Sequence, residues 1–151
     1  MQIKDVVKKH GRAPDKLLKI LLEVQSASDE NYLTYEDIKS VADEMNLPDS
    51  RVYSVASVYT LLSTAPRGKY IIQVCNDVPC YVKGSLNIVD ALEKQLGIKM
   101  GGTTKDKLFT LEYTSCLGCC DNPPAMRIGS KLYSGLTEDK LADILRFYGE
   151  V

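Results

Sequence analysis

This chain of 151 residues contains five cysteines, and the type and spacing of their side chains could support chemistry. Cys75 and Cys80 are separated by four residues, and the other three cysteines lie in residues 116–120, whose sequence is CLGCC. Residues 1–74 contain no cysteine. Four cysteine thiolates are the ligand set of a [2Fe–2S] cluster and also of a structural Zn²⁺ ion. We therefore expect the second half of the chain to hold an inorganic cofactor.

The spacing of the cysteines distinguishes only in part between a [2Fe–2S] cluster and a Zn²⁺ ion. Cys116 and Cys120 are separated by three residues, which together with the first pair suits a two-iron cluster, because each iron takes two thiolates. Cys116 and Cys119 have the two-residue gap that is common in zinc sites. The pattern differs from the three-cysteine run of plant-type ferredoxins. Spacing favours the cluster and leaves zinc or free redox thiols as alternatives.

Two glycines and two aspartates accompany the cysteines. Gly84 and Gly118 would let backbone amides approach closely and donate hydrogen bonds to cluster sulfur, which is one determinant of reduction potential. Asp77 and Asp121 are expected to be exposed turn residues.

The elements that must position the cysteines are two strands. Residues 70–74 alternate in polarity and run directly into Cys75, and residues 109–113 alternate again and end just before Cys116. If these strands are neighbours in one sheet, both loops leave the sheet at the same end. Loops at that position are where sheet-based folds place ligands. The two groups of cysteines would then face one site.

The remaining patterns predict the order β-α-β-β-β-α for the second half of the chain. A helix over residues 85–96 is bounded by Ser85 as cap and by Gly97, and Thr137 caps a last helix. Residues 125–133 have the pattern of a hairpin around Gly129.

The first half of the chain has helical periodicity. Apolar residues recur at helical spacing over residues 17–24 and 52–62, and Thr34 with Asp37 has the form of a capping box. Residues 63–68 break the pattern as a linker would. The prediction is an α/β (α+β) protein, with an N-terminal helical segment (1–66) and a second domain (67–151).

Composition and the absence of certain motifs argue against several functional classes. The 19 basic and 20 acidic residues give a formal net charge of −1, so the chain lacks the positive charge that nucleic-acid binding needs. We found no apolar run long enough to span a bilayer, no secretory signal, and no glycine-rich motif for NAD or flavin. We therefore expect a reducing, cytoplasmic environment. His10 lies in a charged stretch and is expected to be a solvated surface residue.

The sequence resembles the thioredoxin-like [2Fe–2S] ferredoxin subunits of NADH-linked oxidoreductases, from about Leu17 to Leu145. This family includes the small flavoprotein-associated subunit of respiratory complex I and the gamma subunits of NAD-linked or electron-bifurcating hydrogenases and of formate dehydrogenases. The segments that carry the resemblance are Leu21-Leu22-Glu23-Val24-Gln25, Tyr32-Leu33, Val52-Tyr53-Ser54-Val55-Ala56-Ser57-Val58-Tyr59, Pro66-Arg67-Gly68-Lys69-Tyr70, Val74-Cys75, Cys80-Tyr81-Val82-Lys83-Gly84-Ser85, Thr103-Thr104-Lys105-Asp106, Phe109-Thr110-Leu111-Glu112, Cys116-Leu117-Gly118, Cys120, and Pro124 with Met126.

The resemblance implies a thioredoxin-like domain and a particular set of ligands. The family's second pair has three residues between its cysteines and a small residue before the second one. That pattern maps the cluster ligands onto Cys75, Cys80, Cys116 and Cys120 and leaves Cys119 as a small packing residue.

The function that the resemblance implies is electron transfer. The chain would exchange single electrons with the flavin of a partner subunit that binds FMN and NAD(H), alongside further iron–sulfur or hydrogenase subunits, and the helical segment would dock the partner. Departures from the family pattern at Val58, Lys107, Leu108 and Pro123 favour a hydrogenase-type assembly, with complex I or formate dehydrogenase as the alternative. A zinc-binding or thiol-redox module is the competing interpretation from another class.

Overall fold

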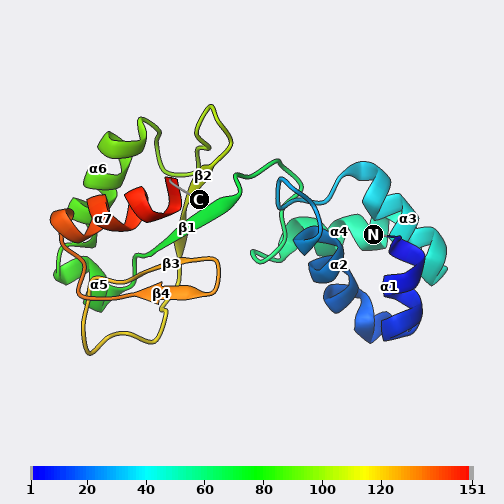
Figure 1. Cartoon of the computed structure of the whole chain (residues 1–151). Coiled ribbons are helices and arrows are strands. Elements are labelled where there is room, and N and C mark those ends of the chain that lie inside the picture. Colours follow the sequence, from blue (N-terminus) through cyan, green and yellow to red (C-terminus); the bar gives the residue numbers. More distant parts are fainter. Residues whose placement is uncertain (1, 150–151) are drawn as a thin grey trace. The chain divides into compact units, whose positions relative to one another are not determined.

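The computed structural model describes residues 2–149 of the chain, which divides into two compact units, Met1–Arg67 (unit 1) and Gly68–Val151 (unit 2) (Figure 1). Arg67, which the sequence prediction placed in the second domain, is buried and bonds within unit 1. Its backbone N–H donates to the Glu30 carbonyl at 2.8 Å, and its Nε donates to the Asn31 carbonyl at 3.0 Å.

Unit 1 consists of helices. They are α1 (Ile3–His10), a 3₁₀ turn (Pro14–Lys16), α2 (Leu17–Ser26), α3 (Tyr35–Met45) and α4 (Asp49–Val58). Helix α3 begins with the predicted capping box, in which Asp37 N–H donates to Thr34 Oγ1 at 3.0 Å and Thr34 N–H donates to Asp37 Oδ2 at 2.9 Å. Helix α4 ends at Val58, before the end of the predicted stripe, and Tyr59 lies exposed beyond it.

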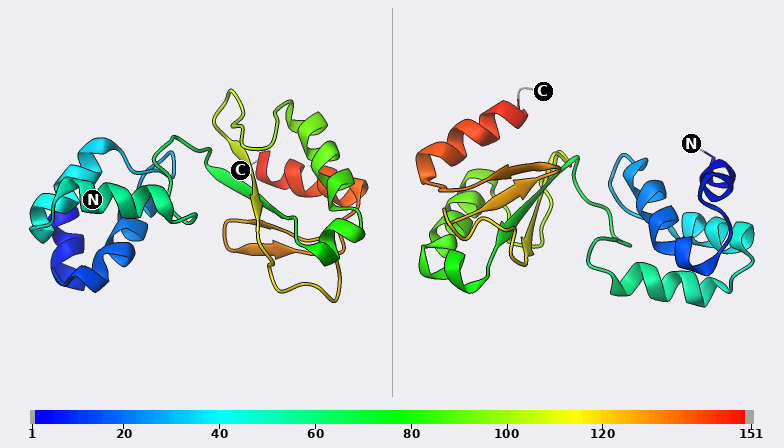
Figure 2. Two further views of the ribbon diagram at one scale, coloured as in Figure 1. Left: turned by 180° about the vertical axis from the view of Figure 1, so that it is seen from behind. Right: turned by 90° about the horizontal axis from the view of Figure 1, so that it is seen from below.

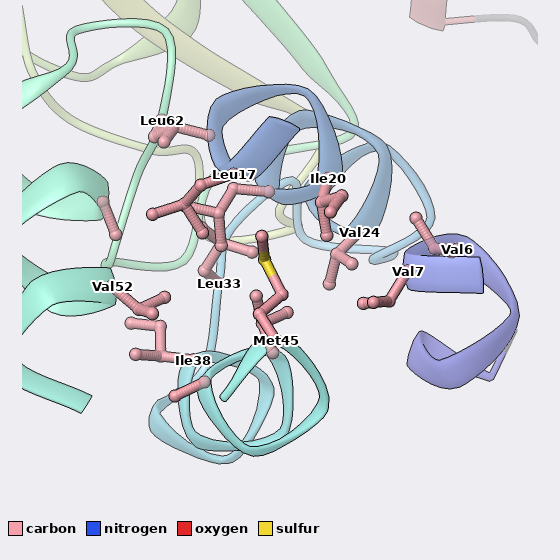
Figure 3. Packing of buried hydrophobic residues seen from close by; sticks show 14 residues of the cluster. Val6, Val7, Leu17, Ile20, Val24, Leu33, Ile38, Met45, Val52 and Leu62 are labelled. Carbon is pink, nitrogen blue, oxygen red and sulfur yellow. The ribbon is translucent and has the colours of Figure 1, made fainter. Parts of the chain in front are cut away.

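The apolar faces of these helices meet in one core (Figure 3). Its members include Val6, Val7, Ile20, Leu21, Leu33, Ile38, Val41, Met45 and Val52. Helix α1, which was not predicted although Ile3, Val6 and Val7 have helical spacing, contributes Val6 and Val7. Its packing overturns the expectation for His10. The His10 side chain is only 10% exposed, and its Nε2 lies 2.5 Å from Glu23 Oε2 on α2, because α1 folds back onto that helix.

Unit 2 has the predicted order with one additional short helix. Its elements are β1 (Tyr70–Cys75), α5 (Val78–Val82), α6 (Ser85–Leu96), β2 (Phe109–Thr114), β3 (Met126–Ile128), β4 (Lys131–Tyr133) and α7 (Glu138–Gly149). Gly84, and not Ser85, is the N-terminal cap of α6, and Gly97 ends that helix in the left-handed conformation, as expected.

The strands form one sheet in the order β2-β1-β3-β4, and the β3–β4 hairpin lies next to β1 in the views of Figure 2. Strands β1 and β2 are parallel, in register from Tyr70 opposite Phe109 to Cys75 opposite Thr114, whereas β3 is antiparallel to β1. Helices α6 and α7 share one core with the sheet, formed by residues that include Ile72, Val74, Ile88, Leu92, Leu111, Met126, Ile128 and Leu141. This core fixes the two parallel strands whose ends carry the cysteines.

Candidate metal centre

The first pair of cysteines lies at the end of β1 and in the short helix that follows it. Cys75 is the last residue of β1, and its N–H donates to the Ala125 carbonyl at 3.1 Å. Cys80 is carried by α5, whose start is favoured by a proline in its first turn. Both thiols are buried, with 1% and 2% of the residue exposed. Their surroundings are therefore dry and apolar.

The second pair lies in the loop that leaves β2. Because β1 and β2 are parallel and Cys75 is opposite Thr114, this loop starts at the same edge of the sheet as the first pair. The Sγ atoms of Cys116 and Cys120 lie 3.3 Å apart, and both residues are exposed. The structure thus brings all four predicted ligands to one edge, two buried and two open to the surface.

The thiols influence one another's ionisation. Burial, and then a hydrogen bond with Cys75, raise the pKa of the Cys80 thiol, whereas a hydrogen bond from the Ala125 backbone lowers it. A hydrogen bond with Cys116, together with burial and the nearby Cys80 and Cys75 thiols, raises the pKa of Cys120 to about 11. Both shifts disfavour the thiolate form, so metal binding at these cysteines has to release their protons.

One of the two expected amide–sulfur hydrogen bonds is present. Gly118, with φ of +80°, directs its N–H to Cys116 Sγ at 3.4 Å. Gly84 instead donates its N–H to the Tyr81 carbonyl at 3.1 Å. The expectation for Gly84 was wrong because this residue, also left-handed with φ of +89°, turns the chain from α5 into α6.

Cys119 has surroundings different from those of its neighbour Cys120. It is half-buried and packs, together with Leu117, against a small apolar cluster formed by Cys75, Cys80 and Ala125. Its carbonyl accepts the N–H of Asn122 at 3.1 Å. A free cysteine packs readily in this way as a small apolar side chain.

The arrangement is one of two thiol pairs. Within residues 2–149, no three side chains of His, Cys, Asp or Glu are gathered as they are around a single metal ion. Cys116 and Cys120 contact each other at the surface, and the buried Cys75 and Cys80 share a hydrogen bond. An all-sulfur donor set in two pairs fits a cofactor whose two irons each take two thiolates.

Sequence reasoning missed the segment that supports the second pair. The turn after β4, residues 134–136, bonds to the loop that carries Cys120: Gly135 N–H donates to the Asn122 carbonyl at 2.7 Å, and Leu136 N–H donates to the Pro124 carbonyl at 3.2 Å. The Pro123–Pro124 peptide bond in this loop is cis. No pattern within either segment indicates that the two lie side by side.

Comparison of the sequence with known proteins identifies a matching family and several relatives. The model of the thioredoxin-like [2Fe–2S] ferredoxin family matches residues 3–149. An NADH-quinone oxidoreductase subunit of Rickettsia prowazekii (strain Madrid E) is 40% identical over 128 residues, which are 85% of this chain and 72% of the relative. Its counterpart of the same name in Rickettsia felis (strain ATCC VR-1525 / URRWXCal2) is 37% identical over 147 residues, 95% of this chain and 87% of the relative. The HndA subunit of the NADP-reducing hydrogenase of Solidesulfovibrio fructosivorans is 37% identical over 132 residues, 87% of this chain and 76% of the relative.

Among solved structures, a chain of an NAD⁺-reducing [NiFe]-hydrogenase in the air-oxidized state has the same fold. The TM-score is 0.79 at 20% sequence identity, and the match covers 94% of this chain but only 24% of the hydrogenase chain. Among the helices of residues 2–149, none combines the length and hydrophobicity that crossing a bilayer requires. From the family match and these relatives, the chain belongs to the thioredoxin-like [2Fe–2S] ferredoxin family.

Proposed function

We propose that this chain is an electron-transfer subunit that holds one [2Fe–2S] cluster on Cys75, Cys80, Cys116 and Cys120. When bound, such a cluster supplies a site that gains and loses one electron at a time. The observation that carries the proposal is the pair of cysteine loops at one edge of the sheet, with Cys116 Sγ only 3.3 Å from Cys120 Sγ. The family match to residues 3–149 supports it.

The protein's own groups have distinct roles in this proposal. The buried Cys75 and Cys80 hold the cofactor on the dry side, and the exposed Cys116 and Cys120 are on the side that a redox partner can approach. The N–H of Gly118 donates to Cys116 sulfur and stabilises added negative charge there. Cys119 stays outside the ligand set and packs against the first pair.

The proposed partner is a subunit that binds FMN and NAD(H). The relatives are named as subunits of an NADH-quinone oxidoreductase and of an NADP-reducing hydrogenase, which are redox enzymes that use pyridine nucleotides. We infer that this chain exchanges single electrons with the flavin of such a partner, in a cytoplasmic assembly of the NAD-linked or bifurcating hydrogenase type. Complex I or an NAD-dependent formate dehydrogenase is the alternative parent enzyme.

Unit 1 is the proposed docking unit. Residues 52–66 contain no charged side chain, although 26% of the chain is charged. Within this stretch Tyr53, Val58, Tyr59 and Leu61 are each at least 48% exposed. Surfaces that are depleted in charge and enriched in tyrosine are typical of the centre of protein–protein interfaces.

The proposal is tested by metal analysis of the full chain reconstituted with iron and sulfide. Two irons and two acid-labile sulfides per chain, with a brown colour that bleaches on dithionite and an EPR signal in the reduced state, are expected. One zinc per chain with no colour would overturn the proposal in favour of the zinc or thiol-redox module.

A further inference from the structure

Three backbone and side-chain hydrogen bonds join the turn after β4 to the loop that carries Cys120. Gly135 N–H donates to the Asn122 carbonyl at 2.7 Å, and Leu136 N–H donates to the Pro124 carbonyl at 3.2 Å. Asn122 Nδ2 also donates to Ser134 Oγ at 3.4 Å. The cysteine loop is therefore held at Asn122 and Pro124 by a segment that is distant in sequence.

Asn122 and Cys120 belong to one tight turn. Asn122 N–H donates to the Cys119 carbonyl at 3.1 Å, which closes residues 119–122 into a four-residue turn with Cys120 inside it. A displacement of the Asn122 backbone would therefore act on the turn that contains Cys120.

The turn at residues 134–136 has firm support of its own. Leu136 is buried in the core of unit 2 together with Leu141 of α7. Lys140 Nζ donates to the Gly135 carbonyl at 2.8 Å. Gly135 is thus held on both sides, by α7 through its carbonyl and by Asn122 through its N–H.

This close approach requires a residue without a side chain at position 135. Gly135 has φ of +57°, a conformation that favours glycine. A Cβ atom there would lie 2.7 Å from both Nδ2 and Oδ1 of Asn122, closer than non-bonded atoms can pack. A larger residue would therefore displace the end of the Asn122 side chain, which also donates to Ser134 Oγ, from its place against the turn after β4.

We propose that Gly135 is a positioning residue for the metal centre: it keeps Cys120 within reach of Cys116 by letting Asn122 pack directly against the turn after β4. The inference rests on the proposed function, because it matters only if Cys120 is a ligand.

The hairpin glycine Gly129 provides a matched control. Its φ of +58° is nearly that of Gly135, but a Cβ atom there would meet nothing within 4 Å. Both Gly→Ala substitutions impose the same kind of backbone strain, and only Gly135→Ala adds the collision with Asn122. The difference between the two variants therefore reports the collision alone.

The test uses the full chain reconstituted with iron and sulfide, and it measures iron loss to a chelator, the EPR spectrum of the reduced state and the thermal unfolding of the apoprotein. Gly135→Ala should lose iron about 10- to 100-fold faster than wild type, with altered g-values, as substitutions beside metal ligands do. Gly129→Ala should stay within about threefold of wild type, because its strain is local. Adding Asn122→Ala to Gly135→Ala removes the colliding amide and should bring iron loss back to within about threefold of Gly129→Ala.

Equal iron loss and equal EPR spectra in Gly135→Ala and Gly129→Ala would overturn the inference, as would a double variant that is no better than Gly135→Ala. If Gly135→Ala does not fold, the double variant decides: a folded, cluster-bearing double variant supports the inference, and an unfolded one overturns it. A wild-type chain that takes up no [2Fe–2S] cluster would instead overturn the proposed function.

Discussion

The Sγ atoms of Cys116 and Cys120 lie 3.3 Å apart, whereas Cys119, the sequence neighbour of Cys120, packs against the buried cluster of Cys75, Cys80 and Ala125. Two adjacent cysteines thus have different surroundings in the same loop. The loop turns between them, so that one thiol meets Cys116 at the surface and the other fills space below it.

Cys119→Ala should leave the iron content and the visible spectrum of the reconstituted chain unchanged, because a methyl group can fill the same half-buried space. Cys120→Ala should lose the cluster, because it removes one of the four proposed ligands. The two adjacent substitutions are controls for each other, and iron and sulfide analysis with visible spectroscopy measures both. Loss of the cluster in Cys119→Ala alone would show that the second pair is Cys116 with Cys119.

Gly118→Ala should lower the reduction potential of the bound cluster. Alanine is strained at φ of +80°, although nothing lies within 4 Å of its Cβ, and relaxation of the backbone would turn the N–H away from Cys116 Sγ. Losing a hydrogen bond of about 0.5–1.5 kcal/mol corresponds to a fall of about 20–60 mV for a one-electron couple. An EPR-monitored redox titration measures it, with Gly129→Ala as the control for a strained glycine position away from the cysteines. An unchanged potential in Gly118→Ala would show that this amide does not tune the cluster.

Val58→Asp should weaken the association of the chain with its NAD(H)-binding partner, because it places a charge on the uncharged, exposed part of unit 1. Val58 is 75% exposed, so the substitution should not disturb the core of the unit. Co-purification with the partner measures the effect, and an intact visible spectrum shows that the cluster domain is unaffected. Leu132→Asp, at a 44% exposed position of unit 2, is the matched control. Equal recovery of partner with both variants would count against unit 1 as the docking surface.

Unit 1 should lose stability as the pH falls below about 4.5, in part through Glu23. Hydrogen bonds from His10 and then Lys9 lower the pKa of Glu23 from its ordinary value of 4.5. A carboxylate whose pKa is lower in the folded state stabilises that state above the ordinary value, and the stabilisation is lost as the pH falls through the lowered pKa.

Urea denaturation of the full chain between about pH 7 and pH 3, followed by circular dichroism, measures this pH dependence. Glu23→Gln should weaken the pH dependence of stability. Asp43→Asn, at an exposed position of α3, is the control for removing one acidic charge elsewhere in the unit. The same pH dependence in Glu23→Gln and wild type would show that the contact with His10 and Lys9 has no linkage to folding.

The features that the sequence predicted correctly are those encoded by neighbours along the chain. The capping box of Thr34 and Asp37 is a local motif, and its hydrogen bonds formed as expected. The alternation in residues 70–74 and 109–113 identified β1 and β2 because one face of each strand is buried. The sequence left open whether these strands are neighbours, and the parallel pairing of β1 with β2 supplies the condition under which both cysteine loops start at one edge.

The features that only the tertiary structure decided depend on contacts between distant segments. His10 is half-buried against Glu23 because α1 folds back onto α2. The helical spacing of Val6, Val7 and His10 puts them on one face of α1, but it does not indicate which helix that face meets. Which of Cys119 and Cys120 meets Cys116 depends on how the loop turns, and that turn is held by Gly135, which lies beyond the next two strands. A sequence pattern records the periodicity of an element, whereas the position of a thiol to within a few ångströms is determined by whatever packs against its loop.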